Sequence, residues 1–273
     1  MYADVTRRAL LGVTDRDTVF EKDGNEVHAV NQVSFDVKEG EILAIVGESG
    51  SGKSTLGRTL LGLDRKTSGE IFFKGSALPT VYRTGDFRRY ARSMQMIFQD
   101  PYSSLNPRMT AGEIIGEALR LHSDFNKADI ATRVEEWLVK VGLSIDHWGR
   151  YPHEFSGGQR QRICIARALA VEPEFIVCDE SVSALDVSIQ PQVLHLLNDL
   201  QERRDLTYIF ISHDLSVVKF MADMMAVMKD GKFVEFGTAE PIYRNPSEDY
   251  TRELNAATPR DDPDPIPEQI GTP

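Results

Sequence analysis

The chain has 273 residues, 41% of them hydrophobic, and a formal net charge of −11. A chain of this length and composition can bury a sizeable core and fold as one large domain with subdomains. The negative charge disfavours a general nucleic-acid binder, because neutralising phosphates requires a basic surface. We therefore expect no nucleic-acid partner.

The sequence carries no signal for membrane insertion or secretion. It has no run of about 18 apolar residues, and residues 1–8 lack the apolar stretch of a secretory signal. Its cysteines, Cys164 and Cys178, lie in apolar stretches, which favours buried thiols over a disulfide or a metal site. We expect a protein that works in the cytoplasm.

Several short apolar runs predict a parallel sheet. An alternating run at 33–37 leads through a turn to Ile42–Val46, which is apolar on both faces and so suits a central strand. Phe175–Cys178 and Tyr208–Ile211 are similar, and a helical pattern at 193–200 separates them. This alternation of strands and helices predicts an α/β core.

Two other patterns modify that core. Residues 110–150 lack strand signals and show helical spacing, which predicts an inserted helical subdomain. Asp230-Gly231 separates the apolar runs Met224–Met228 and Phe233–Phe236, a strong hairpin signal. We therefore expect a mixed sheet with an antiparallel part.

A glycine-rich segment follows the Ile42–Val46 strand directly and matches the P-loop pattern G-x-x-x-x-G-K-[ST] between a strand and a helix. Glycines let successive N–H groups face one anion, and the next helix adds the positive end of its dipole. Lys53 adds a charge on the outer phosphates, and Ser54 adds an oxygen for magnesium. The predicted nucleotide site comprises Gly47, Glu48, Ser49, Gly50, Ser51, Gly52, Lys53, Ser54 and Thr55.

Two carboxylates, Asp179 and Glu180, end the buried strand that begins at Phe175, at the edge where α/β sheets bind ligands. Phosphoryl transfer needs one group to hold the metal and another to orient the attacking water. We assign Asp179 to the magnesium and Glu180 to the water. An isolated Asp-Glu pair is more often an acidic helix start, but the apolar strand and the upstream P-loop favour the catalytic interpretation.

The segment 155–162, Phe-Ser-Gly-Gly-Gln-Arg-Gln-Arg, resembles the signature motif of ATP-binding-cassette (ABC) ATPases, normally written LSGGQ, with Phe155 in place of leucine. It precedes the Asp179-Glu180 strand, as the family requires. Its glycines open a helical stretch, so N–H groups and a helix dipole can form a second anion site. The resemblance implies that Ser156, Gly157, Gly158 and Gln159 contact nucleotide.

Further motifs extend the resemblance in the family's order. Gln99 resembles the Q-loop glutamine, which contacts nucleotide and magnesium, Asp186 the D-loop aspartate, and His213 the switch histidine. Phe20 resembles the A-loop aromatic that stacks on adenine, although a core position on an edge strand is the alternative. The resemblance implies a catalytic set of Lys53, Gln99, Glu180 and His213 and a magnesium set of Ser54, Gln99 and Asp179.

Residues 100–108, 181–190 and 245–252 look like the dipeptide, oligopeptide and nickel importer branch of that family. The resemblance divides the chain into an α/β core at 1–98 and 165–240, a helical and signature subdomain at 99–164 and a C-terminal extension at 241–257. The proline-rich acidic tail at 258–273 is expected to be disordered.

The resemblance also implies the mechanism and the partners. Two ATPase subunits, identical or sister chains, would face head to tail and enclose ATP and Mg²⁺ between one P-loop and the partner's signature. Two transmembrane permease subunits, with an extracytoplasmic solute-binding protein, would complete the transporter at the cytoplasmic face of the membrane. The helical insertion, with Phe125, Trp137 and Trp148, would dock a permease helix, although each aromatic also fits a core position. Peptide is the cargo by family inference, and nickel, glutathione-like compounds, opines and oligosaccharides stay open.

Two other classes of protein share parts of this pattern. A soluble cassette ATPase of DNA repair or translation would normally need a long coiled coil, a second cassette or a basic surface, and the sequence has none of these. A P-loop kinase or a GTPase-like switch gives no role to the segment from Ser156 to Gln159. An ABC importer ATPase accounts for all the motifs.

Overall fold

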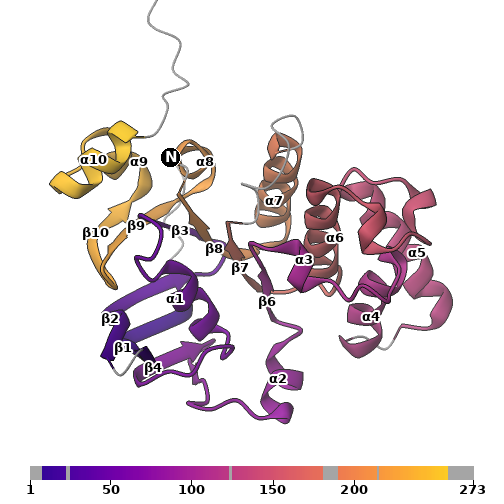
Figure 1. The fold of residues 1–273 in the computed structure, drawn as a ribbon, viewed down its shortest axis with the longest axis horizontal. Helices are drawn as coiled ribbons and strands as arrows, with labels where there is room; N and C mark the ends of the chain where they lie inside the picture. Colours follow the sequence, from indigo (N-terminus) through magenta and orange to yellow (C-terminus); the bar gives the residue numbers. More distant parts are fainter. Residues whose placement is uncertain (1–7, 23–24, 123–124, 181–189, 214, 258–273) are drawn as a thin grey trace, which may run out of the picture.

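In a computed structural model, residues 8–22, 25–122, 125–180, 190–213 and 215–257 are described (Figure 1). A six-stranded sheet forms the centre, in the order β10-β9-β3-β8-β7-β6. Its strands pair in parallel except for β9 and β10, which form the predicted antiparallel hairpin. The bounds are β3 Ile42–Val46, β6 Met94–Ile97, β7 Phe175–Asp179, β8 Thr207–Ser212, β9 Met224–Lys229 and β10 Lys232–Thr238.

The buried strands of the central sheet are the ones that the sequence predicted. Every residue of β3, β7 and β8 is buried, as expected for apolar strands covered on both faces. Parallel strands meet their ligands at their carboxyl ends, so the loops that follow these strands come together at one edge.

A second, antiparallel sheet has the order β2-β1-β4-β5 and lies beside the central sheet (Figure 1). Side chains from both sheets and from helix α1, including Val37, Leu56 and Ile211, share one hydrophobic core. The alternation of apolar and polar residues at 33–37 predicts only part of this sheet. Its strands are β1 Ala9–Lys22, β2 Asn25–Lys38, β4 Ser68–Phe73 and β5 Ser76–Ala77.

The predicted helical insertion is present and lies at the opposite end of the molecule from the antiparallel sheet (Figure 1). Asn126 caps its helix α5 by accepting hydrogen bonds from the N–H groups of Ala128 and Asp129, and Gly142 follows that helix at φ 71°. Cys164 and Cys178 are buried thiols that form no disulfide, as expected. The insertion contains α3 Pro101–Ser104, α4 Ala111–His122, α5 Lys127–Lys140, the first half of α6 Gly157–Ala170, and short 3₁₀ helices at Ile145–His147 and Pro152–Glu154.

The remaining helices lie around the sheets, and two of them end the described part of the chain. Tyr250 of the last helix joins a small core with Val46 of β3 and Val227 of β9. No helix in the described parts of the chain is both long enough and apolar enough to cross a membrane. These helices are α1 Lys53–Leu60, α2 Thr84–Tyr90, α7 Gln190–Arg204, α8 Leu215–Met221, α9 Ala239–Arg244 and α10 Asp249–Ala257.

A test of the packing between α1 and the central sheet uses Gly57. A Cβ atom at this position would lie 2.8 Å from Cγ1 of Val177 and 2.9 Å from Cδ1 of Ile211, so Gly57→Ala forces the helix away from the sheet. Overpacking of this kind lowers the free energy of unfolding by about 1–3 kcal/mol. Gly85→Ala is the control, because the added Cβ has open space in α2 and alanine favours a helix. Urea unfolding should show loss of stability in the first variant and none in the second.

Candidate functional site

The P-loop forms a tight turn between β3 and α1, and its glycines allow close backbone approach. Gly47 has φ 152° and Gly52 has φ 105°. A Cβ atom would lie 2.2 Å from the carbonyl oxygen of Met228 at Gly47, and 2.0 Å from that of Ala29 at Gly52. Only glycine fits at either position, since both the conformation and the space exclude a side chain.

Lys53 is the first residue of α1 and folds back over the loop that precedes it. Its ammonium group donates hydrogen bonds of 2.8 Å to the carbonyl oxygens of Gly47 and Glu48. The side chain is buried, and burial lowers the pKa of Lys53, while nearby carboxylates, that of Glu180 first, oppose this shift. A buried cation is thus fixed at the bottom of the loop, where an anion would approach.

Ser54 and Asp179 meet across the sheet edge. The Ser54 hydroxyl donates to Oδ1 of Asp179 at 2.8 Å, which leaves the lone pairs of the hydroxyl oxygen available to a cation. Asp179 is buried, and burial raises its pKa, with the hydrogen bond from Ser54 offsetting only part of the shift. A buried anion beside a free hydroxyl oxygen is a donor set that fits Mg²⁺, which prefers oxygen ligands.

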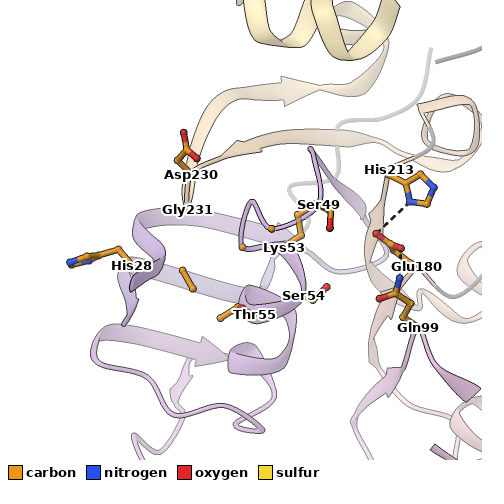
Figure 2. A pocket seen from close by; sticks show the side chains of 13 residues that line it. His28, Ser49, Lys53, Ser54, Thr55, Gln99, Glu180, His213, Asp230 and Gly231 are labelled. Carbon is orange, nitrogen blue, oxygen red and sulfur yellow. Dashed lines mark hydrogen bonds and ion pairs between the residues drawn. The ribbon is translucent and has the colours of Figure 1, made fainter. Parts of the chain in front are cut away.

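Glu180 follows β7 in a left-handed conformation, with φ 45°, which is uncommon for a residue other than glycine. Its N–H group donates to the carbonyl oxygen of Ile211 at 3.0 Å. Its carboxylate accepts a hydrogen bond of 2.6 Å from Nε2 of Gln99 and lies 3.4 Å from Nδ1 of His213 (Figure 2). Residues from three chain segments thus converge on one carboxylate at a strained backbone position.

The P-loop, the start of α1, Gln99, Glu180 and His213 line one open cavity of about 660 Å³ (Figure 2). Asp179 is not part of this lining, although it is hydrogen-bonded to Ser54, which is. One wall of the cavity was not predicted from the sequence. That wall comes from the start of β2 and from the β9–β10 turn, which the Asp-Gly signal predicted only as a hairpin. The N–H group of Gly231 in that turn donates to the carbonyl oxygen of Ser51 at 3.0 Å. The missed lining residues are His28, Ala29, Asp230 and Gly231.

The signature residues lie elsewhere, at the start of α6. Ser156 is the N-cap: its hydroxyl accepts from the N–H group of Gln159 at 3.3 Å, and the Gln159 side chain accepts from the N–H group of Ser156 at 3.0 Å. Ser156 and Gly157 are exposed, and a Cβ atom at Gly157 would meet nothing within 4 Å. No signature residue lines the cavity around Lys53, so the predicted nucleotide contacts are not brought together within one chain.

The start of α6 is tied to the segment that carries Gln99. Nε2 of Gln161 donates to the carbonyl oxygen of Phe98 at 3.1 Å, and the Arg160 guanidinium lies 3.8 Å from the centroid of the Tyr102 ring. Gln161 is completely buried. The role of Gln161 in this contact was not predicted, because its neighbours in the chain do not show whether a glutamine is buried or exposed.

The side chain of Phe20 and the whole of Asp186, both predicted to be site residues, lie outside the part of the chain that the structure describes. The backbone of Phe20 lies in β1, opposite Val27 of β2.

The family model described as "ABC transporter" matches residues 30–183, which include the P-loop, Gln99, the signature and Asp179-Glu180. The chain belongs to the ABC transporter family. As in that family, the protein binds ATP and is an ATPase.

Individual ABC proteins are similar over most of the chain. The oligopeptide transport ATP-binding protein OppF of Bacillus subtilis is 53% identical over 87% of this chain and 78% of its own length. OppF of Streptococcus mutans is 50% identical over 94% of this chain and 84% of its own length. The glutathione import ATP-binding protein GsiA of Escherichia coli is 53% identical over 87% of this chain but only 38% of its own length.

A solved ABC structure has the same fold. A dimeric post-hydrolysis state of the ATP-binding cassette MJ0796, bound to ADP and Pi, matches with a TM-score of 0.79 at 26% identity, over 84% of this chain and 99% of that one. The predicted class, an α/β nucleotide-binding core with a mixed sheet, an antiparallel β part and a helical insertion, is confirmed.

The buried charge of Asp179 generates a prediction about pH. The unfolded carboxyl titrates near 3.8 and the folded one higher, so the folded state binds more protons over that interval and stability falls as pH rises through it. Without nucleotide or magnesium, Asp179→Asn removes this cost and should raise the unfolding temperature at neutral pH. The gain should shrink as the pH falls and vanish well below pH 3.8, where the carboxyl is protonated in both states.

Thermal unfolding from acid to neutral pH measures the difference. Asp230→Asn is the control, because it removes a carboxylate from an exposed position on the same cavity. If Asp179→Asn is less stable than the wild type at neutral pH, the buried charge of Asp179 does not destabilise the fold.

Proposed function

We propose that this ATPase is the nucleotide-binding subunit of an importer for oligopeptides or related small solutes, working at the cytoplasmic face of a membrane. The observation that carries the catalytic part is the convergence of Lys53, Ser54, Gln99, Glu180 and His213 on one cavity (Figure 2). Asp179 is joined to this set by its hydrogen bond with Ser54. The cargo class rests on the similarity to oligopeptide and glutathione transport proteins.

Each residue has a role that follows from its chemistry. The loop's N–H groups and Lys53 bind the phosphates and stabilise the charge that develops on them. Glu180 orients the attacking water, and His213, on the far side of its carboxylate, contacts the outermost phosphate. Gln99 donates to Glu180 and so reports the state of the site to the helical insertion that begins at this residue. Catalysis is mainly placement and electrostatics, as expected for phosphoryl transfer.

Magnesium would be held by Ser54, Asp179 and Gln99. When bound, it supplies charge neutralisation on the phosphate oxygens. Among the described residues, no group of three or more His, Cys, Asp or Glu side chains could hold a metal by itself. This suits Mg²⁺, which typically takes one or two carboxylates and completes its shell with phosphate oxygens and water.

The exposed signature supports a head-to-tail pair of subunits. Ser156, Gly157 and Gly158 form a capped helix start away from the cavity of their own chain, with open space at Gly157. A helix N-terminus favours an anion, so this surface can cover the phosphates that a partner's P-loop holds. Each complete site would then contain the P-loop of one chain and the signature of the other.

We propose a docking place for the permease that differs from the one expected on the helical insertion. Trp137, named with Phe125 and Trp148 for the docking groove, is 3% exposed and belongs to the core. An apolar groove of about 200 Å³ instead extends to Phe98, next to Gln99. We propose that a short permease helix occupies it, because movement there would reach the nucleotide site directly. Its lining includes Leu61, Leu63, Tyr82, Phe87, Tyr90 and Phe98.

The test of this function separates the two neighbouring carboxylates. Glu180→Gln keeps the size of the side chain but removes its charge, so ATP should still bind while hydrolysis slows by about 100-fold or more. Because ATP joins the subunits, blocked hydrolysis should accumulate an ATP-bound dimer. Asp179→Asn should instead weaken magnesium-dependent binding and accumulate no such dimer.

Size-exclusion chromatography with analysis of retained nucleotide measures both effects. In the complex with membrane subunits, Glu180→Gln should also abolish uptake of a labelled oligopeptide. Hydrolysis at the wild-type rate in Glu180→Gln would show that another group orients the water.

Mixed dimers test whether the signature acts on the partner's site. Gly157→Asp places a negative charge at the helix start without a clash in its own chain, and Lys53→Ala removes the phosphate charge. Each variant alone should be nearly inactive, whereas their mixture assembles one site with an intact P-loop and an intact signature and should recover part of the wild-type ATPase rate. A mixture of Lys53→Ala with Glu180→Gln is the control and should recover nothing. Absence of recovery in verified mixed dimers would place the signature's action within its own chain.

A further inference from the structure

The C-terminal motif at 245–252 has no role in the mechanism described above, yet it reaches the nucleotide site. Tyr250 lies in the first turn of α10, and its ring packs in the small core with Val46, the residue that precedes the P-loop. Its hydroxyl oxygen accepts a hydrogen bond of 3.1 Å from the N–H group of Glu48, the second residue of the P-loop.

This contact fixes one particular peptide group. The carbonyl of Gly47 and the N–H of Glu48 belong to the same planar unit. Lys53 donates to its oxygen at 2.8 Å, and Tyr250 accepts from its nitrogen at 3.1 Å. Glycine has few restrictions on its backbone angles, and Gly47 has φ 152°, so the peptide group that follows it can rotate easily. Hydrogen bonds to both its oxygen and its nitrogen hold this peptide group in one orientation.

Tyr250 is itself held firmly by its surroundings. Its side chain is 9% exposed, and the ammonium group of Lys229 lies 4.5 Å from the ring centroid. Burial raises the pKa of Tyr250, so its hydroxyl stays neutral while it accepts the hydrogen bond from Glu48. The position of the hydroxyl is therefore set by packing as well as by the hydrogen bond to the P-loop.

The start of α10 is fastened to the central sheet. The N–H and hydroxyl groups of Ser247 both donate to Oε1 of Glu235 on β10, at 2.9 and 2.7 Å. Arg252 donates to the carbonyl oxygens of Pro246 at 2.7 Å and Ser247 at 3.1 Å. The motif is thus a rigid link from the edge strand of the sheet to the P-loop.

We propose that Tyr250 is a positioning residue for nucleotide binding: through the Gly47–Glu48 peptide it holds the P-loop, and with it Lys53, in the phosphate-binding conformation. This role rests on the proposed nucleotide site. It lies outside the matched family region, 30–183, so it is a contribution of the C-terminal extension.

The role predicts a specific defect in the variant Tyr250→Phe, which keeps the ring and its packing and loses only the hydroxyl. Loss of one neutral hydrogen bond should raise the Kd for nucleotide by about 3- to 10-fold. ATP and ADP should weaken by the same factor, because the P-loop amides cradle phosphates that both nucleotides carry. The kcat at saturating ATP should fall less than the affinity does, because bound phosphates then help to hold the P-loop and Lys53 in place.

Tyr243→Phe is the matched control. Tyr243 lies on α9 and packs against the same core. The ammonium group of Lys219 lies 5.2 Å from its ring centroid, as that of Lys229 lies near the Tyr250 ring. Among the described residues, Tyr243 makes no hydrogen bond to the P-loop. Its nucleotide affinity should equal that of the wild type. A general effect of losing a tyrosine hydroxyl from the C-terminal helices would appear in both variants.

Hydrogen exchange at the Glu48 amide provides a readout that does not depend on nucleotide. Without ligand, this amide should exchange faster in Tyr250→Phe than in the wild type or in Tyr243→Phe. Unchanged exchange and unchanged Kd in Tyr250→Phe would overturn the inference. A wild-type chain that binds neither ATP nor ADP would instead contradict the proposed function, while the exchange measurement would still test the contact.

Discussion

The nucleotide site depends on how closely the P-loop backbone packs against the backbone around it. Gly47 leaves no room for a Cβ atom beside the carbonyl oxygen of Met228, and Gly52 leaves none beside that of Ala29. These contacts join the loop to the end of β9 and to β2, which belong to different sheets. Because the loop is wedged between them, its N–H groups and Lys53 are presented in a fixed arrangement before any ligand arrives.

That rigid loop carries charges that the fold holds in an unfavourable state. Burial lowers the pKa of Lys53 and raises that of Asp179, so both ions are poorly solvated without a ligand. Glu180 sits beside them at a positive φ angle. Such strain and desolvation reduce stability, but they leave charges of both signs ready to interact with phosphate and a divalent cation.

Two different parts of the molecule are connected to the region around the cavity. The signature on α6 is exposed and separate from the cavity of its own chain, while Gln161 and Arg160 link the same helix to the Q-loop segment. A change at Gln99 therefore has a direct structural route to the surface that would meet a second subunit. The second part, the C-terminal extension, reaches the P-loop through Tyr250.

The sequence by itself determined the family, the central strands β3, β7 and β8 and the hairpin, and it predicted the P-loop and the carboxylate pair. These features are local: a run apolar on both faces predicts a buried strand, and a glycine pattern predicts a phosphate loop. Only the tertiary structure decided that Trp137 is core, that His28 and Gly231 line the cavity, and that Tyr250 touches Glu48. The physical reason is distance along the chain, because contacts between residues some 200 positions apart depend on how sheets and helices pack and leave no periodicity in the sequence.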